Sequence, residues 1–88
     1  MRNVVFLERS MEELQQYKGT EPKLVFRIFE LIQNIDQSPF EGLGKPEPLK
    51  GKMQGFWSRR INDEHRLVYR VTDTEILIFT CRSHYGQF

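Results

Sequence analysis

The spacing of apolar residues changes its period halfway along the chain, and this change limits the possible folds more than any other feature. Two segments of the first half, residues 8–18 and 22–38, repeat apolar side chains at helical spacing. The second half holds runs of β-branched and aromatic residues separated by polar turns, at residues 56–61, 66–71 and 76–82. Residues 3–7 add a short buried strand before the helices. This order predicts an α+β fold in which a helix pair covers one face of a twisted antiparallel sheet.

Local signals define the ends of the two helices. Ser10 and Glu13 have the spacing of a capping box, which predicts that their side chains satisfy free amides at the start of the first helix. Gly19 ends that helix, and Pro22 suits the first turn of the next. The second helix stops at Ser38, because the residue before a proline is pushed out of the α region.

The segment 39–52 is different in kind. Six of its 14 residues are Gly or Pro, which excludes a regular helix and predicts a long loop. Loops of this length in small domains are usually functional or disordered, and we favour a function.

Length and cysteine content indicate the class of protein. A chain of 88 residues has room for one domain, so we expect a single domain over residues 1–88. Cys81 is the only cysteine and cannot form an internal disulfide, which favours a reducing compartment, the cytoplasm. The chain holds no apolar run of the roughly 18 residues that a membrane span needs, and the apolar run near its start is too short for a secretory signal.

Positive charge is concentrated in the middle of the chain although the net charge is only +1. Residues 45–70 carry seven basic and three acidic side chains, whereas residues 1–44 carry five basic and seven acidic ones. Such a patch attracts a phosphate backbone, although a solvated charged face has the same composition. The candidate RNA-binding residues in this region are Lys45, Lys50, Lys52, Arg59 and Arg60.

Four residues are candidates for catalysis. Glu47 lies between Pro46 and Pro48, which hold its backbone extended, although prolines also stiffen loops around surface glutamates. His84 and Tyr85 follow the last strand, and histidine suits proton transfer near neutral pH, but a structural role is equally consistent with this position. Arg66 begins a strand, where it could clamp a phosphate or pair with an acidic side chain of the preceding turn. His65, in that turn, is expected to be exposed to solvent.

Sequence spacing supports neither a metal nor a cofactor. Cys81 and His84 are the only residues at a ligand-like spacing, and two residues do not complete a zinc site. Packing within its strand explains Cys81 better. The Gly42-Leu-Gly44 stretch lacks the features of a phosphate-binding loop.

The candidate residues together suit a different chemistry. A carboxylate, a histidine, an arginine, a tyrosine and a cluster of basic residues are what metal-free RNA cleavage requires. That reaction needs a base for the ribose 2′-hydroxyl, a cation at the phosphorus and an acid for the departing 5′-oxygen.

Four motifs, in this order along the chain, resemble the YoeB family. They are Ser-Pro-Phe-Glu-Gly-Leu-Gly-Lys-Pro-Glu-Pro-Leu-Lys at 38–50, Gly-Phe-Trp-Ser-Arg-Arg-Ile at 55–61, Glu-His-Arg-Leu-Val-Tyr at 64–69 and Cys-Arg-Ser-His-Tyr at 81–85. YoeB proteins are RelE-superfamily toxins of bacterial type II toxin–antitoxin systems. The resemblance implies a RelE-like fold, a ribosome-dependent mRNA endonuclease, inhibition by a YefM-type antitoxin, and a homodimer.

The resemblance also implies a role for each candidate. Glu47 is similar to the family's general base, His84 to its general acid, Arg66 to its transition-state clamp and Tyr85 to a residue that orients the substrate. Lys50 and Arg60 match positions near the scissile phosphate. Ideal pairing of the last two strands would point Arg66 and His84 to opposite faces, so we expect the chain to turn after Arg82, although a β-bulge is the alternative.

Two other functions remain open. A ribosome or RNA binder without catalysis would need the basic residues but neither Glu47 nor His84. A gyrase-directed toxin on the same scaffold is the third possibility, and the complete set of Glu47, Arg66, His84 and Tyr85 argues against it.

Overall fold

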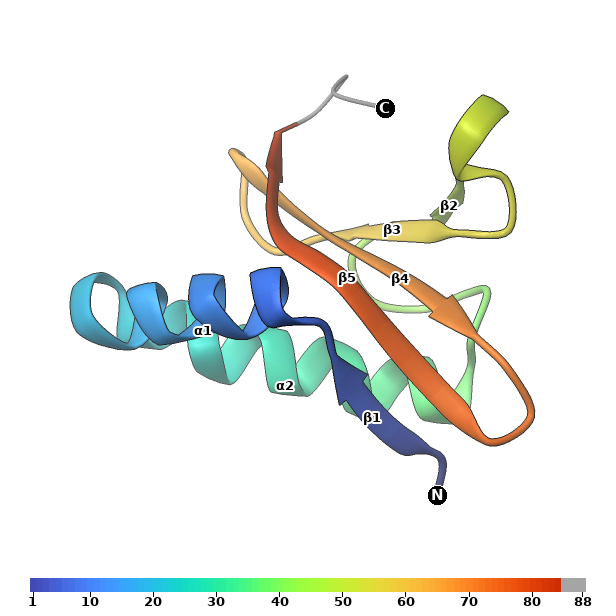
Figure 1. Cartoon of the computed structure of the whole chain (residues 1–88), viewed down its shortest axis with the longest axis horizontal. Helices are drawn as coiled ribbons and strands as arrows, with labels where there is room; N and C mark the ends of the chain where they lie inside the picture. The colour runs from blue at the N-terminus through green and yellow to red at the C-terminus, as the bar shows by residue number, and fades with distance from the viewer. Residues whose placement is uncertain (85–88) are drawn as a thin grey trace.

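A computed structural model describes residues 1–84 of the chain, which form two helices packed on one face of a sheet (Figure 1). The helices are α1 (Glu8–Thr20) and α2 (Pro22–Gln37), and a short 3₁₀ helix, η1, spans Gly51–Met53. The strands are β1 (Asn3–Phe6), β2 (Glu47–Pro48), β3 (Trp57–Arg60), β4 (His65–Val71) and β5 (Glu75–His84). The predicted α+β fold is confirmed.

The sheet has the strand order β1-β5-β4-β3-β2 and is mixed rather than wholly antiparallel. Strands β2 to β5 pair antiparallel, whereas β1 pairs parallel with β5. Parallel neighbours need a long connection, and the helix pair and the β2–β4 segment supply it. Pro48 fits in β2 because this strand is at the edge of the sheet, where a missing amide donor is tolerated.

Helix α2 supplies much of the core. It begins at Pro22 and ends before Ser38-Pro39, as predicted, and buries one stripe of apolar side chains, Ile28, Leu31, Ile32 and Ile35. These pack with Leu67 and Tyr69 of β4 and with Ile76 and Ile78 of β5. In the described part of the chain, residues 1–84, no helix is long and apolar enough to cross a membrane.

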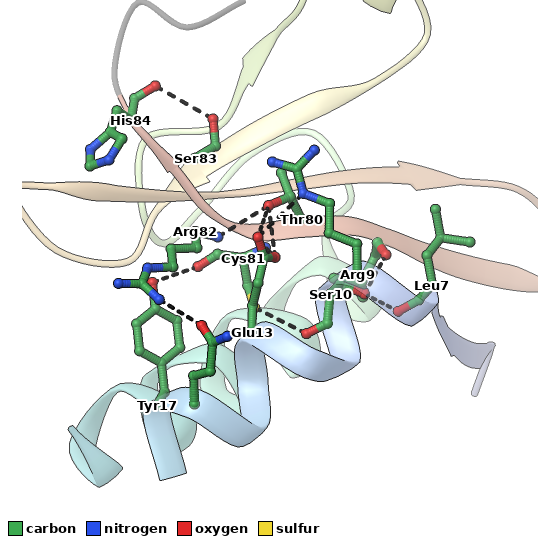
Figure 2. Close-up of polar contacts among 12 residues, drawn as sticks. Leu7, Arg9, Ser10, Glu13, Tyr17, Thr80, Cys81, Arg82, Ser83 and His84 are labelled. Atoms are coloured by element: carbon green, nitrogen blue, oxygen red, sulfur yellow. Dashed lines mark hydrogen bonds and ion pairs between the residues drawn. The ribbon is translucent and has the colours of Figure 1, made fainter. Parts of the chain in front are cut away.

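The predicted capping box is wrong, because both side chains bond to β5 instead (Figure 2). The Ser10 hydroxyl donates to the carbonyl oxygens of Leu7 at 2.9 Å and Ile78 at 2.8 Å. The Glu13 carboxylate accepts from the Thr80 hydroxyl at 2.8 Å and the Cys81 amide at 3.0 Å. Helix α1 also continues through Gly19 to Thr20. Its polar side chains therefore attach it to the sheet rather than capping its own end.

Cys81 is a core residue. Its side chain is fully buried, and burial raises the pKa of the thiol to about 12. The thiolate is the reactive form of cysteine, so a raised pKa makes this thiol inert near neutral pH. The prediction that Cys81 serves packing is confirmed.

Candidate active site

The first candidate residue, Glu47, lies on the edge strand β2. Its backbone pairs with Ser58 of β3, and Pro48 pairs with Trp57. The proline on either side restricts the backbone, and the pairing fixes the position of Glu47 relative to the sheet. The side chain is 62% exposed. A carboxylate at this edge is therefore held in place at its backbone while its oxygens remain accessible.

Arg66 on β4 is directed toward Glu47. Its guanidinium hydrogen-bonds the buried Ser58 hydroxyl and lies 3.4 Å from a Glu47 carboxylate oxygen, measured from Nη2 to Oε2. The Arg66 side chain is only 11% exposed. A mostly buried guanidinium that contacts both Ser58 and Glu47 is held in one orientation, which is what a group that stabilises developing charge requires. The part that Ser58 plays in holding Arg66 was not predicted from the sequence.

These residues line a small cationic cleft. Its walls are Lys45, Glu47, Arg60 and Arg66, and its volume is about 230 Å³. Strand pairing places Arg60 directly opposite Arg66. Three cationic side chains around one carboxylate can bind a phosphodiester by charge-assisted hydrogen bonds while the carboxylate accepts a proton.

The loop before β2 reaches this cleft through a strained turn. Lys45 adopts a left-handed backbone conformation with φ of +52°, and Gly44 before it has φ of +80°. The Gly44 carbonyl accepts a 2.7 Å hydrogen bond from the Arg60 amide, and a Cβ atom on Gly44 would lie only 3.0 Å from the Arg60 carbonyl oxygen. Only glycine fits this close approach. The turn therefore places Lys45 beside Arg60 at the cleft.

Arg59 corrects the list of candidate RNA-binding residues. Its side chain is fully buried and points toward α2, because neighbouring residues of a strand face opposite sides of the sheet. The guanidinium donates five hydrogen bonds, to the Tyr69 hydroxyl, the Asn34 side chain and the carbonyl oxygens of Ser38, Glu41 and Leu43. The prediction that Arg59 contacts RNA from the surface is wrong in this structure. Arg59 instead holds the loop that carries Lys45 and Glu47.

His84 ends β5 and lies beside His65. The two histidines are directly paired across β4 and β5, and their ring centroids are 5.1 Å apart. The expected turn after Arg82 is wrong, since β5 continues through His84. Two register shifts occur instead, between Arg66 and Val68 and between Val68 and Tyr69. Arg66 lies opposite Ser83, so the two shifts leave Arg66 and His84 on opposite faces of the sheet, as ideal pairing would.

His65 is also placed differently from its prediction. It begins β4 and is only 5% exposed, rather than lying in an exposed turn. Its ring packs against Tyr17 of α1, with ring centroids 5.7 Å apart, as well as against His84. The turn ends one residue earlier than expected because the Asn62 side chain accepts hydrogen bonds from the amides of Glu64 and His65. His65 is thus part of the folded sheet.

Five candidate residues remain: four basic residues with exposed side chains, and Tyr85, which the structure does not describe. Lys45, Lys50, Lys52 and Arg60 are exposed, so their side chains can reach a large ligand. Lys50 and Lys52 lie at η1, beyond the cleft lining. Tyr85 lies outside the described residues 1–84.

Comparisons with known proteins agree on one family. The sequence model of the YoeB-like toxins of bacterial type II toxin–antitoxin systems matches residues 6–85. Toxin YoeB of Escherichia coli strain K12 is 50% identical over 82 residues, which cover 93% of this chain and 98% of the relative. The similarity therefore extends over nearly the full length of both proteins.

Solved structures give the same result. The YoeB dimer from Staphylococcus aureus superposes with a TM-score of 0.91 at 44% identity, covering 96% of this chain and 98% of that one. The heterotetrameric YoeB–YefM toxin–antitoxin complex from the same organism has a TM-score of 0.88 at 43% identity, covering 97% of this chain and 99% of the matched chain. In these relatives the fold occurs both as a dimer and with an antitoxin.

Proposed function

Since the chain belongs to the YoeB family of toxins of bacterial type II toxin–antitoxin systems, we propose that it is a ribosome-dependent endoribonuclease that cleaves translated mRNA. The observation that carries this proposal is the contact between Glu47 and Arg66 in a cleft also lined by Lys45 and Arg60. A base beside a fixed cation, with further positive charge around both, matches the needs of RNA transesterification.

In the proposed reaction Glu47 removes the proton from the ribose 2′-hydroxyl. The resulting oxygen attacks the adjacent phosphorus, and the bond from phosphorus to the 5′-oxygen breaks. Arg66 stabilises the negative charge that accumulates on the phosphate oxygens. The products are a 2′,3′-cyclic phosphate and a free 5′-hydroxyl, and no metal ion takes part in this step.

His84 is the proposed acid that protonates the departing 5′-oxygen. In an in-line displacement the attacking and leaving oxygens lie on opposite sides of the phosphorus, so the base and the acid need not touch each other. The side chain of Arg66 reaches Glu47, while its backbone lies opposite Ser83, next to His84. His84 is paired with His65 and shares its face of the sheet, which is the face opposite to that of Arg66. As the acid, His84 would have to turn its side chain around the end of β5 toward a phosphate held by Arg66. Tyr85 is proposed to orient the substrate.

Exposed basic residues are proposed to bind the RNA backbone and the ribosome. Substituting Lys50→Ala together with Arg60→Ala should weaken this binding, and the effect should shrink at high salt, because each phosphate contact releases counterions. For single-stranded RNA, the slope of log K against log salt should fall by about 0.7 for each phosphate contact that the substitutions remove. Filter binding of the variants to ribosomes over a salt series measures this slope.

A matched control removes the same charge from the helical side of the molecule. Lys18→Ala together with Lys23→Ala, both exposed residues of α1 and α2, should leave affinity and slope near those of the wild type. If the two double variants bind alike at low salt, the basic residues near the cleft form only a solvated face.

The proposed partners follow from the relatives. We expect a homodimer and a YefM-type antitoxin, which are the assemblies named for the similar structures. An acidic antitoxin segment would complement the charge of the cleft formed by Lys45, Arg60 and Arg66 and so cover the proposed site. A toxin that acts on mRNA works in the cytoplasm, and residues 1–88 are proposed to act as one domain.

Expression in cells tests the function itself. Induction without an antitoxin should arrest growth, and primer extension on cellular mRNA should reveal new 5′ ends within translated regions. Arrest with intact mRNA would instead support an inhibitor that binds ribosomes without cleaving RNA.

A further inference from the structure

A second group of side chains, Glu64, His65 and His84, has the composition of a metal site. Each offers one possible ligand atom, and these three atoms all lie within 4.8 Å of one another. The chain contains only two histidines, and both are in this group. Two imidazoles and a carboxylate are a common ligand set for zinc and are unlike the all-oxygen sets that magnesium and calcium prefer.

The strand register brings the three residues together. His65 and His84 are a directly opposed pair of β4 and β5, with ring centroids 5.1 Å apart. Glu64 precedes His65, and its Oε1 lies 3.6 Å from the His65 Nε2. Two register shifts between β4 and β5 create this pairing, and they cannot be read from sequence spacing.

The ring of His65 is held in a fixed position within this group. Its Nδ1 atom is buried and has no hydrogen-bond partner within the described residues 1–84, although buried polar atoms nearly always have one. The ring is held by packing between Tyr17 and His84. The nitrogen that faces Glu64 is Nε2, 3.6 Å from its Oε1, so packing of the ring fixes a ligand atom at the group before any ion binds.

We propose that Glu64, His65 and His84 bind a zinc ion. Zinc holds nitrogen and oxygen ligands at about 2.0–2.2 Å, so the three ligand atoms must draw together by roughly an ångström. The Glu64 side chain is 66% exposed and His84 is exposed, so both have room for this movement around the fixed His65 ring. The site has three protein ligands and leaves a position for water.

The zinc site has a consequence that rests on the proposed function. A zinc ion bound to His84 occupies the imidazole that is proposed to protonate the 5′-oxygen. Zinc binding and RNA cleavage then exclude each other, so zinc inhibits the toxin by occupying the side chain of its general acid, His84.

Thermal unfolding of the free protein, prepared without a histidine tag, tests binding without any ribosome. Zinc chloride at about ten times its Kd should raise the Tm by about 5–10 °C, whereas magnesium chloride should not. Glu64→Gln and His84→Asn, both at exposed positions, should each remove more than half of this shift. Asp63→Asn changes a neighbouring carboxylate outside the group and should keep it. No zinc shift in the wild type, or an equal shift in Glu64→Gln and His84→Asn, overturns the proposal.

Cleavage assays separate the two proposals. Zinc should inhibit mRNA cleavage by the wild type, and Glu64→Gln should need a higher zinc concentration for the same inhibition. If the protein binds zinc through these residues but does not cleave RNA, the zinc site is supported and the proposed function is wrong. If the protein cleaves RNA but its Tm does not change with zinc, the proposed function is supported and the zinc site is wrong.

Discussion

Glu47→Gln and His84→Gln are each expected to lower the rate of mRNA cleavage by about 10²–10⁴-fold, the share of one positioned base or acid. Glutamine keeps nearly the shape of glutamate but cannot accept the 2′-hydroxyl proton. At position 84 it removes the proton donor to the 5′-oxygen. Single-turnover cleavage of ribosome-bound mRNA measures both rates.

Folding should be unaffected by these two substitutions. Both side chains are exposed, and exposed substitutions usually change the free energy of unfolding by about 0.5 kcal/mol or less. Glu41→Gln is the matched control, since it removes an exposed carboxylate from the same loop and should leave the rate unchanged. Wild-type cleavage by a protein that carries both substitutions would exclude this acid–base mechanism and favour other groups in the cleft.

Arg59→Ala should lower stability more than any of the other substitutions proposed for this chain. It removes five hydrogen bonds of a fully buried guanidinium, one of them buried and four partly buried, to acceptors that include the Asn34 side chain and three loop carbonyls. Losing this network and the packing of the side chain should cost about 3–5 kcal/mol. For a chain of this size the Tm should then fall by at least about 12 °C, as measured by circular dichroism.

The neighbouring residue provides the control. Arg60→Ala removes the same charge from an exposed position and should change the Tm by only a few degrees. Arg59→Lys should remain well below the wild type, because an ammonium cannot reproduce the forked geometry of the guanidinium. Equal melting temperatures for Arg59→Ala and Arg60→Ala would show that the buried network contributes little.

Much of the fold could be predicted because its signals are local. Helix α2 runs from Pro22 to the residue before Ser38-Pro39, and the β-rich runs of the second half became β3, β4 and β5. The side chains of Ser10 and Glu13 do not form the capping box that their spacing predicts, because their partners lie on β5, more than 60 residues away in sequence. Contacts of this range compete with local capping and leave no trace in the spacing.

The candidate site was predicted in part. The prolines around Glu47 indicated a fixed carboxylate, and the structure brings it to Arg66. Charge alone predicts that Arg59 and Arg60 both lie at the surface, because it takes no account of strand direction. Adjacent residues of a strand face opposite sides, so one of the two arginines had to point toward the helices. That signal was present in the sequence. The pairing of His65 with His84 depends on the register shifts, which no pattern in the sequence reveals.

The proposed mechanism is tested most sharply by letting purified protein cleave an mRNA held on ribosomes and identifying the ends of the products. Cleavage of ribosome-bound mRNA, absent for free mRNA and for Glu47→Gln, should leave a 2′,3′-cyclic phosphate or its hydrolysed form and a 5′-hydroxyl. Products with a 5′-phosphate and a 3′-hydroxyl would refute the mechanism, because the ribose would then not be the nucleophile. Full cleavage by Glu47→Gln would refute the assignment of the base.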